Sequence, residues 1–415
     1  MPTSTISTRR LALLLGGLAM FGPFSIDMIF PAFPQIGAQF AADKIAMQQT
    51  ISAYLFAYAA MSMAHGPLSD ALGRKGVIVI GLCVFALASV GCALATDLPM
   101  LLAFRVLQGL SAGVGLIVGR ALIRDVLHGD DAQRLMSQVS VVFGIAPAIA
   151  PIVGGWLLGW ARWPGIFWFL VGVSLLLIVA TVFWLPETHP PRNRTALRPR
   201  ALLRDYIAVF ANARFQRLAA AAAFNFAALF LYIASAPAFV LDYLHLNERQ
   251  FGWFFVPMIG GMMLGSFMSG RAAGRISGAR LSAIGFACCG AAVAGNVAYT
   301  ALAPALALPW AVLPIILNAF GVALVFPILT LSILDMYPRQ RGSASSLQAF
   351  TSLVVNALIA GVLSPLLSDR PLYLALGAAV FALAGWLFWR WEIRRGHRVP
   401  EVPEQAAALE LTERM

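Results

Sequence analysis

The sequence predicts an all-α integral membrane protein, with twelve transmembrane helices arranged as two six-helix bundles. The composition is the first reason: 60% of the 415 residues are hydrophobic, only 11% are charged, and the mean hydropathy is +0.81. A soluble domain carries about 25% charged residues. The second reason is that apolar runs of about 20 residues, the length that crosses a bilayer, recur along the chain. The third is a long hydrophilic segment, 187–216, with six such runs on each side.

The predicted spans follow one another with short connections. The first apolar run follows Arg9 and Arg10, as in a secretory signal, but it is too long for the apolar part of a signal, so we expect an uncleaved first span. We expect an N-terminal bundle at 1–186, a cytoplasmic linker loop at 187–216, a C-terminal bundle at 217–392 and a cytoplasmic tail at 393–415. The twelve spans are expected at 11–33, 46–66, 77–95, 99–122, 135–158, 164–186, 217–241, 251–270, 281–303, 309–334, 343–367 and 371–391.

The net charge of +11 is distributed asymmetrically. Nearly all lysines and arginines fall at the termini and in the loops that follow even-numbered spans; the exceptions are Lys44, Arg105, Arg162, Arg249 and Arg370. By the positive-inside rule, both termini and the linker loop are expected in the cytoplasm, with the spans in the inner membrane. The basic excess therefore reflects topology, and we expect no nucleic-acid partner. Within the linker, 198–210 is expected to form a short surface helix against anionic lipid.

Asp27 is the one carboxylate that falls in the middle of a predicted span. A charge in hydrocarbon costs at least about 2.5–3.5 kcal/mol, so such a residue is a candidate functional site. Arg105 lies within the fourth span, and Asp27 and Arg105 are expected at ~10 Å and ~9 Å from the same membrane face, counted from Pro34 and Pro99. Burial favours a neutral carboxyl and a nearby arginine favours an ionised one. A moving contact would make Asp27 a proton site; the alternatives are a static buried ion pair and an arginine that extends to the membrane surface.

The loop after the second span carries the most specific string, Gly66-Pro-Leu-Ser-Asp70-Ala-Leu-Gly73-Arg74-Lys. Gly66 and Gly73 permit tight turns, Asp70 suits a helix N-terminus, and Asp125 is the expected partner of Arg74. The string resembles the signature loop between helices 2 and 3 of the major facilitator superfamily. The resemblance implies that these residues form a cytoplasmic gate; the alternative is an ordinary solvated turn.

The fourth and fifth spans extend this resemblance. Arg105 is similar to the arginine that this family carries in helix 4, which is tied to proton coupling. The fifth span combines Pro147 and Pro151 with Gly154 and Gly155, which predicts a kinked helix with a flat face. This pattern resembles the family's antiporter motif, although the residue before the second proline is alanine. The eleventh span has no equivalent, an asymmetry that the resemblance assigns to drug/proton antiporters.

Longer strings resemble the Bcr/CflA branch of drug-resistance antiporters, and they extend from the first span to the eleventh. The resemblance implies export of small, chemically mixed compounds in exchange for protons. The strings lie at 27–34, 150–156, 166–168, 186–188, 235–237 and 333–347.

Candidate substrate contacts are aromatic and amide side chains inside the spans, because promiscuous pockets are mostly apolar with few polar groups. The alternative for each is ordinary packing. The five histidines fall in loops or at span ends, and the four cysteines lie in spans without metal-ligand spacing, so we expect no enzyme, metal or cofactor. The rivals are a proton-coupled metabolite importer and, from another class, a polytopic membrane enzyme or a channel. One chain of twelve spans is expected to act as a monomer. The candidate substrate contacts are Tyr54, Tyr58, Asn225, Phe226, Phe230 and Asn318.

Overall fold

A computed structural model describes residues 8–395 except 128, 192–193, 195–196, 273–274 and 339. Within these residues the chain is helical, without a β-strand. The elements are α1 (Thr8–Asp27), a 3-10 turn η1 (Phe30–Ala32), α2 (Phe33–Phe40), α3 (Lys44–Leu72), α4 (Arg74–Ala93), α5 (Leu98–Ala112), α6 (Val114–Val126), α7 (Gly129–Leu158), α8 (Pro164–Trp184), α9 (Pro199–Phe210), α10 (Ala213–Ala234), a π-helical segment η3 (Ala238–Tyr243), α11 (Gly252–Ala272), α12 (Gly278–Leu302), α13 (Leu313–Met336), α14 (Arg341–Leu358), a second π-helical segment η4 (Ile359–Leu363), α15 (Ser364–Leu367) and α16 (Pro371–Arg394).

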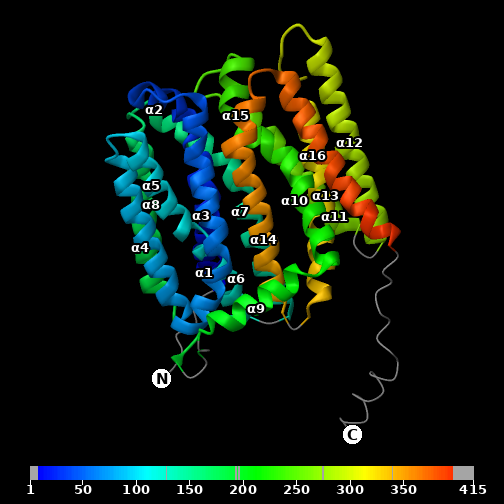
Figure 1. The fold of residues 1–415 in the computed structure, drawn as a ribbon. Helices are drawn as coiled ribbons and strands as arrows, with labels where there is room; N and C mark the ends of the chain where they lie inside the picture. The colour runs from blue at the N-terminus through cyan, green and yellow to red at the C-terminus, as the bar shows by residue number, and fades with distance from the viewer. Residues whose placement is uncertain are drawn as a thin grey trace.

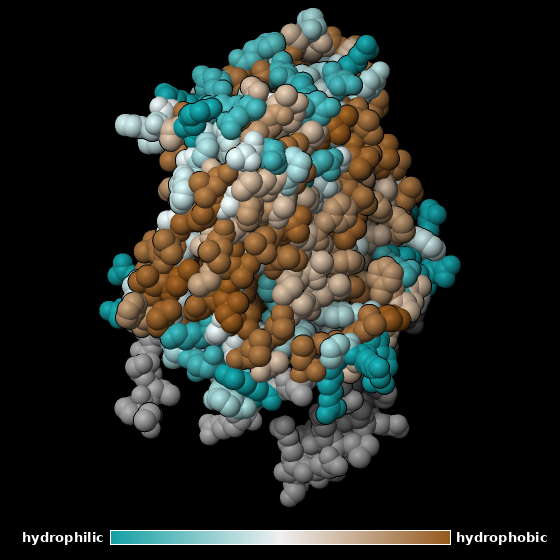
Figure 2. All heavy atoms as spheres, turned by 60° about the vertical axis from the view of Figure 1, so that its left-hand side comes forward, coloured by the Kyte–Doolittle hydropathy of each residue, from teal (hydrophilic) through white to brown (hydrophobic). Residues whose placement is uncertain are grey.

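The long helices lie side by side (Figure 1). In the described part of the chain, 11 helical segments are long and apolar enough to cross a membrane. The predicted span at 46–66 lies in α3, which has 29 residues but is too polar to count among them. On the face that Figure 2 shows, an apolar band crosses the middle of the molecule, and hydrophilic residues gather toward both ends. The all-helical membrane fold is therefore confirmed.

The helices form two groups that follow the sequence. In the first half α1 packs along α7, α4 along α8 and α3 along α5; in the second half α10 packs along α16 and α12 along α13. The halves meet where α3 lies against α14 and where α7 lies against α11. The start of α1, the end of α16 and α9 share one end of the molecule, which we call the terminal end; α2 and α15 lie at the opposite, distal end (Figure 1).

The first span differs from its prediction, because α1 ends at Asp27 and the chain turns before it continues as η1 and α2. The cause is Pro31, which has no N–H to donate to the carbonyl of Asp27. Pro31 and Pro34 are each the second residue of a new helical segment, where a missing N–H costs nothing. The predicted end of the span near Pro34 is thus wrong, since α2 runs on to Phe40. Asp27 occupies a helix terminus, and the depth counted from Pro34 no longer applies.

The second span also runs further than predicted. Gly66 and Pro67 lie inside α3, so the turn predicted at Gly66 is wrong. Pro67 has no N–H for the carbonyl of Met63, and the Tyr206 hydroxyl of α9 donates to that carbonyl instead, at 2.8 Å. The longer helix places His65 in its interior at 3% exposure, where the sequence predicts a span end.

Candidate functional site

Arg105 lies at the centre of a polar cluster inside the first half. Its side chain is completely buried. Nε donates to the Thr50 carbonyl (3.2 Å), and Nη1 donates to the Ser25 carbonyl (3.2 Å) and to Gln108 Oε1 (2.9 Å). The guanidinium also lies 4.4 Å from the centroid of the Tyr54 ring. The Ser25 carbonyl belongs to the last turn of α1, where carbonyls lack intrahelical donors. Arg105 therefore caps the broken end of α1.

Asp27 lies beside this cluster at 4% exposure. It interacts electrostatically with Arg105 and Tyr54. None of the ion pairs within 4.0 Å among the described residues includes Asp27, however, so the expected direct pair with Arg105 is absent in this conformation. Three other acceptors occupy Nε and Nη1. Nη2 of Arg105 is buried without a hydrogen-bond partner, and an unpaired buried donor is costly.

A second buried acid shows what a static pair looks like in this fold. Glu392 near the end of α16 is 7% exposed, and its two carboxylate oxygens pair with Arg214 Nε and Arg217 Nε, each at 2.8 Å. Both carboxylate oxygens of Glu392 thus have a cationic partner, which offsets the cost of burial. Asp27 has no such partner in the described structure, so its environment differs from that of a structural ion pair.

Hydrogen bonds between helices hold the cluster in place. The Tyr54 hydroxyl shares a bond of 2.7 Å with Ser25 Oγ and donates to the Gly22 carbonyl at 3.1 Å. Gln108 Nε2 donates to Ser89 Oγ at 2.8 Å, which links α5 to α4. The sequence prediction missed Ser25, Ser89 and Gln108, and it selected Tyr54 only as a candidate substrate contact. The available signal was Gln108, a polar residue one turn after Arg105 in an apolar helix.

Glycines bring the surrounding helices into close contact. A Cβ at Gly109 would overlap the carbonyl oxygen of Tyr54, and one at Gly115 would overlap that of Leu18 in α1. In α7, Gly154 faces the carbonyl of Met28, the residue after Asp27. Gly residues let backbones approach in this way. These three glycines thus bring α5, α6 and α7 into backbone contact with α3, α1 and the segment after Asp27.

The proline and glycine motif of α7 also joins the two halves. Pro147 and Pro151 both lie within the helix. A Cβ at Gly155 would overlap the carbonyl oxygen of Glu248 in the second half. Gly154 and Gly155 therefore place α7 between the break in α1 and the segment that precedes α11.

Side chains of α3 close the distal end by donating to the second half. The Gly361 carbonyl is available as an acceptor because residue 365, four positions later, is a proline and has no N–H to donate to it. The π-helical segment η4 covers the same stretch of chain. The four contacts are Lys44 Nζ to Asp242 Oδ2 (2.7 Å), Gln48 Nε2 to the Ala234 carbonyl (2.8 Å), Gln49 Nε2 to the Gly361 carbonyl (2.8 Å) and Ser52 Oγ to the Ala357 carbonyl (2.9 Å).

Arg74 organises the terminal end of the first half. Its Nε pairs with Asp125 Oδ2 at 3.0 Å, which confirms the predicted contact. Its Nη1 pairs with Asp70 Oδ1 at 2.6 Å and donates to Ser69 Oγ at 2.5 Å. The Arg74 backbone N–H donates to Glu187 Oε1 at 3.0 Å. Ser69, Asp70 and Asp125 belong to the first half, and Glu187 is the first residue of the linker. In this conformation these contacts of Arg74 hold the first half and the start of the linker together and do not reach the second half.

Substitution of Gly73 by alanine is expected to destabilise the protein. Gly73 is the single residue between α3 and α4, and its φ of 102° with ψ of 149° is a conformation almost confined to glycine. A Cβ there would lie 2.6 Å from Glu187 Oε2. We expect a loss of about 1–3 kcal/mol, measured by thermal unfolding of the purified protein. Gly66→Ala is the matched control, since its Cβ meets nothing within 4 Å; equal stability of both variants would refute the assignment.

The candidate substrate residues fall in three separate places. Tyr54 and Tyr58 lie in α3, with their rings edge to face at 6.5 Å. In the second half, Phe226 and Phe230 stack at 6.2 Å, and the Asn225 side chain is buried with both polar atoms unpaired.

Asn318 lines a different space, a cavity of about 10 Å³ within the second half that also contacts Tyr232 and Asn296. The cavity is large enough for about one water molecule. The structure therefore does not bring all six candidates to one pocket.

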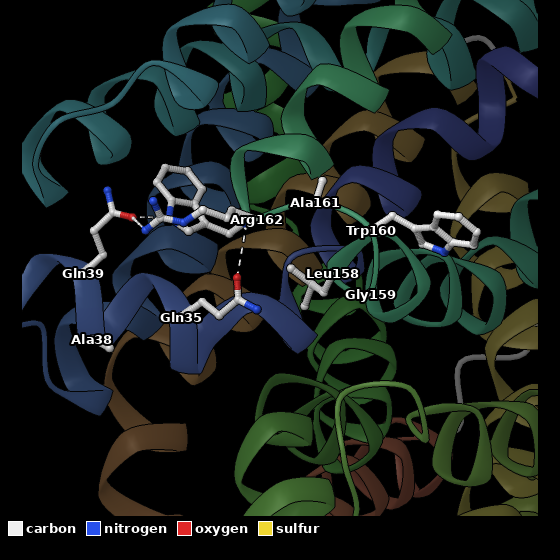
Figure 3. Close-up of a pocket in the computed structure, with 9 residues that line it drawn as sticks. Gln35, Ala38, Gln39, Leu158, Gly159, Trp160, Ala161 and Arg162 are labelled. Carbon is white, nitrogen blue, oxygen red and sulfur yellow. Dashed lines mark hydrogen bonds between the residues drawn. The ribbon is translucent and has the colours of Figure 1, made fainter.

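A hollow lies at the distal end of the first half, between α2 and the segment 158–163 (Figure 3). Its volume is about 690 Å³. Gln39 Oε1 accepts hydrogen bonds from Arg162 Nη2 (3.2 Å) and Trp163 Nε1 (2.8 Å), and Gln35 Oε1 accepts one from the Trp163 backbone. None of the predicted site residues lines this hollow. We regard it as a surface feature rather than as the transport site.

Two packed groups of membrane helices, with a buried carboxylate and arginine inside the first group, are an arrangement typical of membrane transporters. Residues 15–360 match the family model described as Major Facilitator Superfamily. The chain belongs to the major facilitator superfamily, as the resemblance in the sequence implies. Metal ligands are absent from the described residues, where no group of three His, Cys, Asp or Glu side chains is placed to hold a metal ion.

Relatives with resistance and transporter names match most of the chain. A bicyclomycin resistance protein homolog of Haemophilus influenzae is 27% identical over 394 residues, covering 90% of this chain and 94% of the relative. The uncharacterized MFS-type transporter YdgK of Bacillus subtilis is 30% identical, with 90% and 92% covered. Multidrug resistance protein D of Escherichia coli is 26% identical, with 81% and 84% covered. The branch predicted from the sequence strings agrees with these names.

Solved structures agree on the fold. A D-xylose–proton symporter superposes with a TM-score of 0.73 at 15% identity, covering 93% of this chain and 98% of the other. The human organic anion transporter MFSD10 gives a TM-score of 0.67 at 19% identity, with 94% and 99% covered. At these identities the likeness establishes the architecture alone.

Proposed function

We propose that this protein exports small drug-like molecules across the bacterial inner membrane in exchange for protons, by alternating access. The resistance proteins among its relatives support drug export. One observation carries the coupling: Asp27 is buried at the break in α1, beside an Arg105 whose Nη2 has no partner. The excess of basic residues at the terminal end supports a cytoplasmic location for that end. The single chain contains both halves and is proposed to act as a monomer.

The proposed proton cycle uses the free nitrogen of Arg105. While Nη2 stays apart from the carboxylate, burial favours a protonated, neutral Asp27. When the end of α1 shifts and Nη2 contacts Asp27, the ionised form is favoured and the proton leaves. The break after Asp27 supplies a point where the backbone can move without disturbing the rest of α1. Coupling follows if substrate binding and proton binding favour different positions of this break.

Alternating access is proposed to use the two ends of the molecule in turn. In this structure the distal end is closed by the α3 contacts with the second half, centred on Gln48, Gln49 and Ser52. Opening that end breaks these hydrogen bonds and exposes their groups to water. We propose that Asp70 and Arg74 then hold the terminal end closed, as the gate predicted from the sequence, by exchanging contacts within the first half for contacts with the second.

The substrate site is proposed to lie between the halves. Tyr58, Asn225, Phe226, Phe230 and Asn318 remain candidate contacts. Tyr54 is fully enclosed here and is bonded to α1, so we propose that it positions Arg105 as well. Neither a metal nor a cofactor is part of the proposal.

A proton-coupled importer is the nearest alternative, and the α7 motif and the names of the relatives favour export over it.

Transport in everted vesicles that contain the protein distinguishes the exporter from the importer and from a channel. Compounds first selected by a susceptibility panel in a host that lacks its own exporters are added to vesicles with a preformed proton gradient. An exporter collapses the gradient on addition of substrate. Substrate accumulation that needs no gradient, as in a channel, or gradient-driven loss of substrate from the vesicles, as in an importer, would contradict export.

A further inference from the structure

The short helix α9 has two faces with different surroundings. Its inner face contacts both halves: the Tyr206 hydroxyl donates to the Met63 carbonyl of α3 at 2.8 Å and interacts with Ser346 of α14. Val209 is fully buried, and its carbonyl accepts from the Tyr337 hydroxyl at 3.5 Å. Burial raises the pKa of Tyr206, so its hydroxyl keeps the proton that it donates.

The outer face of α9 combines apolar and basic side chains. Leu203 and Ile207 are one turn apart and are 60% and 59% exposed. Arg200 and Arg204 are also one turn apart and exposed on the same side of the helix. Asp205 is the only acidic residue of α9, so the helix carries net positive charge. Exposed leucine and isoleucine beside arginines are the composition of helices that lie in a membrane interface.

The position of α9 agrees with that composition. Met63 lies nine residues before the end of α3 at Leu72, or about 14 Å along the helix axis. Ser346 lies within the first two turns of α14. The helix therefore lies across the side of the bundle, at the level of the last turns of the spans, and Figure 1 shows it crossing beneath α3 and α14. Its outer face is exposed at this level of the bundle.

We propose that the outer face of α9 binds anionic phospholipid headgroups of the adjacent leaflet, with Leu203 and Ile207 inserted among the acyl chains and Arg200 and Arg204 at the phosphates. Charge complementarity selects this occupant, because a basic side chain near an anionic surface contributes about fivefold in affinity. Since the inner face is bonded to α3 and packs on α14, bound anionic lipid stabilises the contact between the halves at the terminal end. This site is independent of the transported compound and of Asp27.

Amide hydrogen exchange of the full-length protein in nanodiscs tests the proposal. Exchange in 199–210 is compared between phosphatidylcholine alone and phosphatidylcholine mixed with phosphatidylglycerol. We expect phosphatidylglycerol to slow exchange in the wild-type helix, and the double variant Arg200→Gln/Arg204→Gln to lose that protection, by up to about thirtyfold for the two charges. Added salt should weaken the effect.

The matched control is Arg275→Gln/Arg280→Gln, which removes one exposed charge from the α11–α12 connection and one from the first turn of α12. This variant should keep the lipid-dependent protection of α9. Equal exchange in the two lipid mixtures, or protection that survives in the α9 double variant, would overturn the proposal. Protection that depends on the number of protein copies in a disc, whatever the lipid, would assign the face to a second copy of the chain instead.

Discussion

Asp27→Asn is expected to reduce substrate-driven collapse of the proton gradient in everted vesicles to the level of vesicles without the protein. Asparagine has the size and shape of aspartate but cannot exchange a proton at this site. Among the described residues Asp27 makes no ion pair, so the substitution removes no static partner and the protein should still fold. The measurement is gradient collapse per amount of protein in the membrane.

The control for this variant is Asp131→Asn, an exposed carboxylate near the start of α7. It should collapse the gradient as the wild type does. Gradient collapse by Asp27→Asn at the wild-type level would exclude Asp27 as the proton carrier. Reduced amounts of Asp27→Asn protein in the membrane would show that the residue is structural.

Arg105→Lys is expected to abolish the exchange of substrate for protons and to destabilise the protein as well. The planar guanidinium of Arg105 donates in several directions and also stacks on Tyr54. A lysine ammonium cannot reproduce the planar, forked arrangement of the guanidinium donors. At least two charge-assisted hydrogen bonds of about 1.5–3 kcal/mol each are therefore lost. We expect a loss of about 3–5 kcal/mol in stability, measured by thermal unfolding, together with loss of gradient collapse.

The matched substitution is Arg124→Lys, which changes an exposed arginine in the last turn of α6. Arg124→Lys should leave the unfolding temperature and the exchange unchanged. If Arg105→Lys behaves in the same way, a positive charge alone is enough at this position, and the proposed switching of a specific guanidinium nitrogen is wrong.

Much of the architecture could be predicted from the sequence, because membrane spans are specified by the apolar composition of contiguous segments. Asp27 and Arg105 could be selected because each is a charge inside an apolar segment, whereas the Arg74–Asp125 pair was predicted from the loop string after the second span. The acceptors of Arg105 could not be predicted. Two of them are backbone carbonyls, and every residue has one, so only the packing of α1 and α3 shows which carbonyls are near Arg105.

The positions of the helix breaks could be predicted in part from the prolines. Pro31 lies four residues after Asp27, and Pro365 lies four residues after Gly361, so each proline leaves a carbonyl without its donor. The sequence shows that such carbonyls exist. It does not show that Arg105 caps the end of α1 or that Gln49 donates to Gly361, because those contacts join segments far apart in the chain.

Proton release on substrate binding tests the central claim most directly. Purified protein in weakly buffered detergent solution is mixed with a transported compound, and the free proton concentration is followed with a pH indicator. The account predicts that wild-type protein releases protons when the compound binds, and that Asp27→Asn binds the compound without releasing them. Equal proton release from Asp27→Asn would contradict the account, because the proton would then come from another group.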